Sequence, residues 1–307
     1  MKLVYKYIVV VVISVFSVLE LEAQQEVQFT HYMYNTLSVN PAYAGSKGML
    51  NITGLMRQQW VGIDGAPVSQ NLMVHTPIIS KNMGVGLSFL NDKAGPIKQT
   101  SIAADYSYSI RINQAGKLNV GIKAMLNFIQ ANLTSLKLDQ LNDQTFSANP
   151  TTLSPNLGFG VYYHTDKWYL GASTPKILET SIAANSQTIV SKLNRHYYIV
   201  GGYVQRLSNL WNLKPAFLTK LTTNAPISVD LSLEAYYNNK LSFGVMHRFG
   251  DSFGFLCGFQ LTNQLKASVS FDQTVSRLMN YNSGTFEMFL SYDFTFKKDK
   301  IITPRYF

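Results

Sequence analysis

The chain has 307 residues and a formal net charge of +9, and only 14% of its residues are charged while 13% are aromatic. Roughly 25% charged residues is typical of soluble domains, so this composition suits a surface that faces lipid. The lysines and arginines are spread along the chain without a dense cluster, which argues against a nucleic-acid interface. The single cysteine, Cys257, excludes an intrachain disulfide and is interpreted as a small packing residue on an apolar strand face.

Residues 1–23 have the pattern of a secretory signal peptide. Lys2 and Lys6 flank the start of an apolar run from Tyr7 to Leu19, and Ala23 supplies the small residue before a cleavage site. The run is short for a helix that spans a membrane, so we expect cleavage rather than an uncleaved anchor, and the lack of a nearby cysteine excludes a lipoprotein. No later segment approaches about 18 consecutive apolar residues, so a membrane-embedded mature chain must form a closed barrel.

Residues 24–48 show no clean hydrophobic period. The Asn40-Pro41 pair and Gly45 mark turns or irregular backbone within this segment. We predict a periplasmic segment that precedes the barrel and could tuck into the barrel mouth. The last residues, 297–307, are predicted to be a periplasmic tail that docks onto the barrel or a partner.

The clearest strand candidate is 285–296, where apolar and mostly polar residues alternate. Phe286, Met288 and Leu290 begin the apolar series, and Glu287 and Ser291 belong to the polar series. Alternation over about ten residues suits a strand that crosses a bilayer at a tilt, and the aromatic end of the series suits the girdle at a membrane boundary. We therefore predict an outer-membrane barrel over 49–296.

Strand candidates follow one another through this region, and their even number, about 14, agrees with bacterial single-chain barrels. Some alternate well, such as 227–238, and others alternate weakly, such as 211–221 with its Pro215. The predicted fold class is all-β: a monomeric transmembrane barrel of antiparallel strands with periplasmic termini. The candidates are 49–58, 68–76, 82–91, 99–112, 117–129, 156–164, 167–173, 192–206, 211–221, 227–238, 240–248, 252–261, 265–273 and 285–296.

The connections between these strands give an independent test. Connections from even to odd strands are short, such as Thr165–Asp166 and Asn238–Asn239, and the long loops all run from odd to even strands. Short turns at one end and long loops at the other are typical of outer-membrane barrels, with the short end periplasmic. The long loops are Gln59–Pro67, Gln130–Pro155, for which we expect a short surface helix, Thr174–Ser191 and Thr274–Gly284.

Charged residues at inward strand positions are interpreted as a network in the barrel lumen, because a polar barrel interior permits both signs of charge. The alternative is a selective pore lined by the same groups. The residues assigned inward are Arg57, Asp105, Arg111, Asp230, Glu234, Arg248, Asp272, Glu287 and Asp293.

Enzyme and cofactor signatures are weak. The glycine pairs Gly84–Gly86 and Gly158–Gly160 lack a following Lys-Ser/Thr and do not open a helix, so they are attributed to barrel geometry rather than to a phosphate site. The histidines show no metal-ligand spacing, and no Gly-x-Ser-x-Gly element is present. We predict a protein that is not an enzyme, with no catalytic residues, cofactor or metal.

Three groups of residues carry a family resemblance. The first is Asn40-Pro41-Ala42-Tyr43-Ala44-Gly45, followed by Arg57-Gln58-Gln59-Trp60-Val61-Gly62 and Gly65-Ala66-Pro67; the second is Ser283-Gly284-Thr285-Phe286-Glu287; the third is Pro304-Arg305-Tyr306-Phe307. Together they resemble the PorP/SprF family, outer-membrane proteins of the type IX secretion and gliding-motility machinery of Bacteroidetes. Phe286 stands where the family usually has a histidine, which puts any role of that histidine in doubt.

The resemblance implies a barrel that works with the secretion apparatus, with a periplasmic peptidoglycan-binding partner and with a secreted adhesin that carries a type IX C-terminal domain. In this interpretation the long loops hold the secreted substrate, and the segment before the barrel and the tail contact the machinery. The alternative is an outer-membrane porin or selective channel. The residues expected to bind partners are Asn40, Pro41, Tyr43, Gly45, Arg57, Trp60, Pro304, Arg305, Tyr306 and Phe307.

Overall fold

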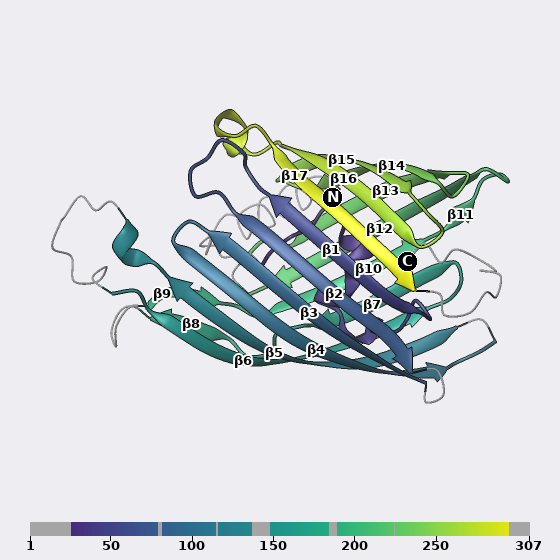
Figure 1. Cartoon of the computed structure of the whole chain (residues 1–307), viewed down its shortest axis with the longest axis horizontal. Helices are drawn as coiled ribbons and strands as arrows, with labels where there is room; N and C mark the ends of the chain where they lie inside the picture. Colours follow the sequence, from purple (N-terminus) through teal and green to yellow (C-terminus); the bar gives the residue numbers. More distant parts are fainter. Residues whose placement is uncertain are drawn as a thin grey trace, which may run out of the picture.

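A computed structural model describes residues 26–78, 82–114, 116–136, 148–183, 189–223 and 225–294. The predicted signal peptide and tail lie outside the described residues. The described chain forms one closed antiparallel barrel (Figure 1). Its sheet holds 15 strands, of which β11 (Gln205–Arg206) is a two-residue continuation of β10, leaving 14 wall strands. The predicted closed antiparallel barrel of 14 strands is confirmed.

The wall closes because the first strand pairs with the last. β1 pairs with β17 from Leu50↔Phe294 to Gln58↔Phe286, and β10 pairs with β12, with β11 extending the same pairing. The wall strands are β1 (Leu50–Gln58), β2 (Val68–Ile78), β3 (Met83–Ala94), β4 (Ile97–Arg111), β5 (Lys117–Ala131), β6 (Thr151–His164), β7 (Trp168–Thr174), β10 (His196–Tyr203), β12 (Trp211–Thr222), β13 (Ser228–Tyr237), β14 (Leu241–Arg248), β15 (Ser252–Gln260), β16 (Leu265–Thr274) and β17 (Thr285–Phe294).

Every predicted strand has a counterpart in the wall, and the largest errors are at two starts. β6 begins at Thr151, five residues before the predicted start at 156, because Thr151–Pro155 continue the ladder with β5. β10 begins at His196 rather than 192, because residues 189–193 form β9 (Ile189–Leu193), which pairs with β8 (Thr180–Ala183) as a separate hairpin. Pairing of neighbouring segments, which the hydrophobic pattern does not report, sets both boundaries.

The long loops gather at one end of the barrel and the short turns at the other (Figure 1). The long-loop end carries η4 (Leu133–Ser135), the β8–β9 hairpin and η6 (Arg277–Tyr281). The surface helix expected in 130–155 is present only as η4 among the described residues of that loop. Bacterial outer-membrane barrels generally have their long loops outside the cell and their short turns in the periplasm.

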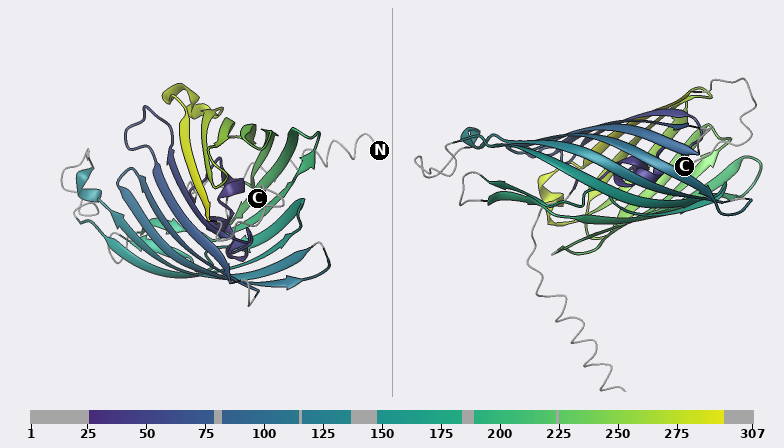
Figure 2. Two further views of the ribbon diagram at one scale, coloured as in Figure 1. Left: turned by 45° about the vertical axis from the view of Figure 1, so that its right-hand side comes forward. Right: turned by 90° about the horizontal axis from the view of Figure 1, so that it is seen from below.

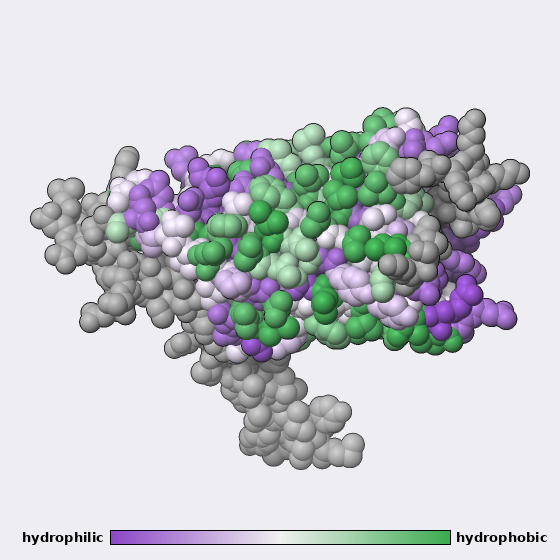
Figure 3. All heavy atoms as spheres, turned by 60° about the horizontal axis from the view of Figure 1, so that its bottom comes forward, coloured by the Kyte–Doolittle hydropathy of each residue, from purple (hydrophilic) through white to green (hydrophobic). Residues whose placement is uncertain are grey.

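The two faces of the wall differ as the alternation predicts. On β17, Phe286, Met288 and Leu290 are 51–62% exposed, whereas Glu287 and Ser291 are buried. Figure 3 shows apolar residues gathered across the middle of the barrel surface with polar residues toward its ends. Cys257 lies on this outer face. Among the described helices, none is long and apolar enough to cross a membrane.

The segment before β1 fills the interior of the barrel. It forms three short helical turns, η1 (Tyr32–Tyr34), α2 (Thr36–Val39) and η2 (Pro41–Tyr43), which lie inside the wall in Figures 1 and 2. The segment was expected on the periplasmic side, at most in the barrel mouth. Its apolar residues, among them Met33, Leu37 and Tyr43, are almost fully buried, and only the lumen provides enough surface to bury them.

Candidate functional site

The plug, which we define as residues 29–45, passes through the whole lumen. Before it, Glu26 pairs with Lys176 of the loop after β7, at 2.7 Å and 2.9 Å, which places Glu26 at the long-loop end. Burial opposes ionisation of Glu26, but the charge of Lys176 and then that of His196 lower its pKa below the usual value. After the plug, Lys47 lies 3.6 Å from Asp293, at the short-turn end of β17. The chain therefore enters the lumen at one mouth and leaves it at the other.

A buried cluster of charges fixes the start of the plug to the wall. Arg57 Nη1 lies 2.8 Å from Asp272 Oδ2 and 3.0 Å from Glu287 Oε2. Glu287 also accepts hydrogen bonds from the backbone N–H groups of Thr30 and His31, both at 2.9 Å, and its Oε1 lies 2.7 Å from His31 Nδ1. Thr30 Oγ1 donates to Asp272 Oδ2 at 2.5 Å and accepts from Arg57 at 2.8 Å. We call these five residues the pin.

The pin stabilises the position of the plug strongly because its side chains are buried. The side chains of Arg57, Asp272 and Glu287 are at most 2% exposed. Removing one partner of a buried ion pair leaves an unpaired charge and costs about 3–5 kcal/mol. The pin therefore ties the plug to β1, β16 and β17, the strands on either side of the barrel closure.

A second cluster surrounds Tyr34, one turn further along the plug. The Tyr34 hydroxyl donates to Glu234 Oε2 at 2.5 Å and accepts from Lys266 Nζ at 2.7 Å, and it also contacts the Tyr236 hydroxyl. Lys266 Nζ lies 3.9 Å from the centroid of the Tyr34 ring, a distance that suits a cation–π interaction. Phe289 packs against the same ring, with centroids 5.0 Å apart. The wall thus holds Tyr34 by both its hydroxyl and its ring.

The end of the plug fits against inward-facing glycines of β3, β5 and β6. A Cβ atom would come within 2.1 Å of Ala44 O at Gly84, within 2.3 Å of Ala42 N at Gly121, and within 2.1 Å of Asn40 Oδ1 at Gly160. Real Cβ atoms essentially never approach other atoms this closely, so a side chain at Gly84 or Gly121 would collide with the plug backbone, and one at Gly160 would collide with the Asn40 side chain. We call these three residues the glycine cradle.

Asn40 organises this end of the plug. Its Nδ2 donates to Val161 O of β6 at 2.9 Å, and its Oδ1 accepts from Ala42 N at 3.0 Å, which caps η2. Nearby, Tyr43 packs edge-on against Tyr162, with ring centroids 5.5 Å apart. Gly45 has φ +70° and lies against Pro77, in a conformation that favours glycine. The Asn-Pro-Ala-Tyr-Ala-Gly run is therefore shaped to fit the inner wall.

The residues predicted to bind partners fall into separate places. Asn40, Pro41 and Tyr43 lie in the lumen, and Arg57 belongs to the pin, so these buried side chains cannot touch a partner while the plug is seated. Trp60 lies apart from them in the β1–β2 loop, partly exposed, where its backbone N–H donates to Thr285 Oγ1 at 3.2 Å. The predicted Pro304–Phe307 site lies outside the described residues.

Most of the charges assigned to the lumen are buried there, including Asp105, Asp230 and Arg248. Arg111 is exposed at the end of β4, and Asp293 is only partly buried, because inward positions at a strand end meet solvent at the mouth. The lumen also holds Lys123, Lys214 and Lys266, which were not assigned inward. Their positions follow the same alternation that placed the acidic residues, and that signal could have identified them. Among the described residues, no cluster of histidine, cysteine or acidic side chains could hold a metal ion.

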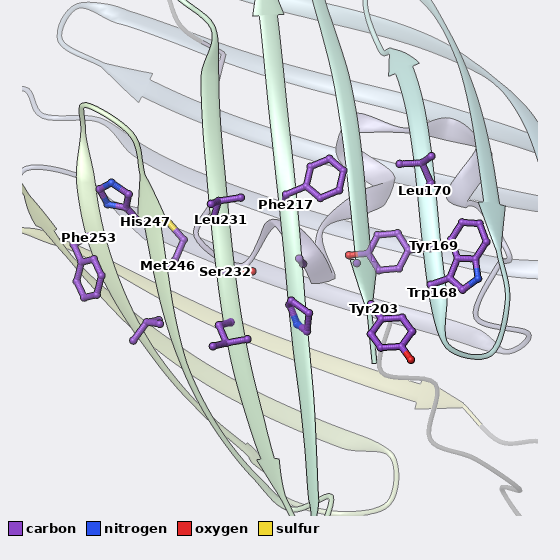
Figure 4. Close-up of a pocket in the computed structure, with 15 residues that line it drawn as sticks. Trp168, Tyr169, Leu170, Tyr203, Phe217, Leu231, Ser232, Met246, His247 and Phe253 are labelled. Atoms are coloured by element: carbon purple, nitrogen blue, oxygen red, sulfur yellow. The ribbon is translucent and has the colours of Figure 1, made fainter. Parts of the chain in front are cut away.

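A hollow of about 680 Å³ lies on the outer face of the wall, between β7 and β15 (Figure 4). Its rim includes the exposed side chains of Trp168, Leu170, Tyr203 and Leu231. The hollow opens onto the apolar outer face, away from the charged residues of the lumen. It is therefore separate from the candidate site in the lumen.

The comparisons with known proteins agree with this architecture. The family model described as type IX secretion system membrane protein PorP/SprF matches residues 21–292. Among solved structures, the toluene transporter TbuX of Ralstonia pickettii is similar with a TM-score of 0.51 at 8% identity, covering 84% of this chain and 92% of its own. The CymD monoaromatic hydrocarbon channel is similar with a TM-score of 0.50 at 11% identity, covering 85% and 92%. No curated protein sequence matches the chain.

Proposed function

Because the chain belongs to the PorP/SprF family of type IX secretion system membrane proteins, we propose that it acts as a non-enzymatic anchor that supports the export or surface attachment of a secreted adhesin. The chain is a multi-pass protein of the outer membrane and a component of this secretion system. In the proposal, the long loops hold the adhesin, and the short-turn end faces a periplasmic peptidoglycan-binding partner. Gliding motility is the process such attachment would serve.

The observation that carries this proposal is the pinned plug. Two buried clusters and the glycine cradle hold residues 29–45 across the lumen. With the plug in place, the barrel is a rigid body and the lumen is not an open channel. A barrel whose interior is packed with side chains can bear load between two membrane faces without leaking solutes. A plugged barrel of this kind suits an anchor better than a porin.

The first experiment is an affinity purification of the tagged protein from detergent-solubilised outer membranes, with identification of the proteins that co-purify. We expect a large secreted adhesin together with a peptidoglycan-binding protein. In parallel, a strain that lacks the barrel is expected to lose that adhesin from its surface. Recovery of the barrel alone, with unchanged surface proteins in the deletion strain, would contradict the anchor proposal.

The predicted tail gives a second test of the same proposal. Deletion of Pro304–Phe307 is expected to reduce adhesin display while the barrel remains folded in the outer membrane. Heat-modifiable migration on a gel would verify the folded barrel in the same samples. Normal display from the truncated barrel would argue against a role for the tail.

The alternative is a channel in which the plug moves aside. The names of the two similar structures, a toluene transporter and a hydrocarbon channel, motivate this alternative. Planar-bilayer recordings of the purified full chain separate the two proposals. An anchor is expected to conduct little, whereas steady conductance at rest would favour the channel.

A further inference from the structure

The wall has a notch at the long-loop end, between β6 and β10. β6 pairs with β5 along its whole length, from Thr151 to His164. On its other side it pairs with β7 only from Phe159 to His164, because β7 has 7 residues and β6 has 14. The edge of β6 from Thr151 to Gly158 therefore has no ladder partner among the described residues.

An irregular segment, Pro175–Glu179, closes this notch, and we call it the strap. A backbone bond joins the strap to the β6 edge, from Ile177 N to Leu157 O at 2.8 Å. The other links use side chains: Asn156 donates to Leu178 O at 2.6 Å and accepts from Leu178 N at 3.0 Å. Beyond the strap, Ser154 Oγ lies 2.5 Å from Thr180 Oγ1.

The strap stands within the apolar part of the wall. The outward side chains of Leu153 and Leu157 on β6 are each 58% exposed, and that of Leu178 on the strap is 50% exposed. In lipid, unpaired backbone groups cost several kcal/mol each, so an open edge must be covered by some hydrogen-bonding segment. The strap meets this need with few backbone bonds, and an extended segment could meet it with a regular ladder.

From this geometry we propose that the β6 edge is a docking site for an extended segment of the secreted partner, which displaces the strap and adds a strand to the barrel wall. The proposal rests on the anchor function above and assigns its contact site. Exposed sheet edges recognise extended peptides by backbone bonds, and pockets for alternate side chains give specificity. The exchange replaces the hydrogen bonds between the strap and the edge by those of a regular ladder.

The chemistry of the edge defines the segment that fits it. Positions of the docked segment beside Leu153 and Leu157 would point outward toward lipid and therefore require apolar side chains. Positions of the docked segment beside Ser154 and Asn156 would point into the lumen and therefore accept small polar side chains. Pro155 lacks a backbone N–H, which removes one bond and disfavours unselective pairing with other strands. The expected partner segment is short and alternates apolar with polar residues.

The strap is also linked to the segment that precedes the plug, so docking would change the contacts at the entrance of the lumen. Lys176 of the strap pairs with Glu26, the residue from which the chain enters the lumen. On the other side, Arg195 Nε donates to Ile177 O at 2.7 Å. Displacing the strap breaks both links and frees the entrance of the plug.

A disulfide lock tests the proposal. In a Cys257→Ser background, the pair Ser154→Cys and Thr180→Cys joins β6 to the end of the strap after the barrel has folded. The matched control is Thr274→Cys with Asn282→Cys, whose side chains form a 3.1 Å hydrogen bond within the β16–β17 loop. The measurement is the surface amount of the secreted protein that the deletion strain fails to retain.

We expect oxidation of the strap lock to lower surface retention at least tenfold, reduction to restore it, and the control lock to change nothing. Full retention with the oxidised strap lock would overturn the docking proposal and leave the anchor function intact. A deletion strain that retains all of its surface proteins would instead overturn the anchor function itself.

A photocrosslinking residue at Leu157, compared with one at Phe255 on the opposite wall, supplies an independent readout. Crosslinks from Leu157 to one short segment of the partner are expected, and equal labelling from both positions would contradict docking at the edge.

Discussion

The outer and inner faces of the barrel wall obey different rules although the same strands build both. On β17, the outward Met288 is 62% exposed on the apolar outer face, whereas the inward Glu287 is held by Arg57, Thr30 and His31. The outer face requires apolar character but no particular neighbour. The inner face requires particular atoms at particular distances, because it must match the plug. A substitution therefore has different consequences depending on the face it alters.

The largest effect is expected at the pin. Arg57→Ala leaves the carboxylates of Asp272 and Glu287 buried without their main cation, so we expect a loss of about 3–5 kcal/mol in the free energy of unfolding. The loosened plug should also raise the conductance of the barrel in planar bilayers. Urea unfolding in lipid vesicles and single-channel recording measure the two effects.

Arg111→Ala is the matched control for this prediction, because Arg111 is exposed at the end of β4. Surface substitutions of this kind usually change stability by no more than about 0.5 kcal/mol. If both arginine variants were equally stable, the pin would not be what secures the plug, and the contrast between the faces would fail.

The outer face gives the second prediction, with a smaller effect. Met288→Leu keeps the lipid-facing side chain apolar and should be nearly neutral, whereas Met288→Arg puts a charge into the hydrocarbon. We expect the arginine variant to lose about 2–4 kcal/mol, because an arginine on the lipid face costs that much near the bilayer midplane. The readout is the urea unfolding midpoint of each variant in the same vesicles. Equal losses for leucine and arginine would mean that Met288 makes a specific contact.

The two faces also differ in how far the sequence predicts them. Strict alternation, as in 285–296, identified the wall strands and their lipid-facing sides, since period-two patterns report directly which residues face an apolar medium. The same alternation placed Arg57, Asp272 and Glu287 in the lumen. Lipid acts on every strand in the same way, so the outer face can be predicted one strand at a time.

The plug could not be predicted in this way, because its fit depends on residues far apart in the chain. Residues 29–45 lack a hydrophobic period, and their partners lie in β1 to β7, β12, β13, β16 and β17. The sequence pattern attributes Gly84 and Gly160 to barrel geometry and predicts no role for Gly121. Their shared feature, glycine at inward positions of β3, β5 and β6, becomes meaningful only once residues Asn40–Ala44 lie against them.

The glycine cradle allows the same substitution to be compared on both faces. A Cβ atom at Gly121 would come within 2.3 Å of the Ala42 backbone nitrogen, whereas one at Gly54, which faces outward on β1, would meet no atom within 4 Å. Gly121→Ala should therefore cost about 1–3 kcal/mol by overpacking. Gly54→Ala should gain about 0.4–1 kcal/mol, because alanine reduces the freedom of the unfolded chain. Urea unfolding of both variants should show shifts of opposite sign, with the slope of the transition unchanged. Equal losses at both positions would mean that these glycines serve the curvature of the wall, and the plug would then be seated without the cradle.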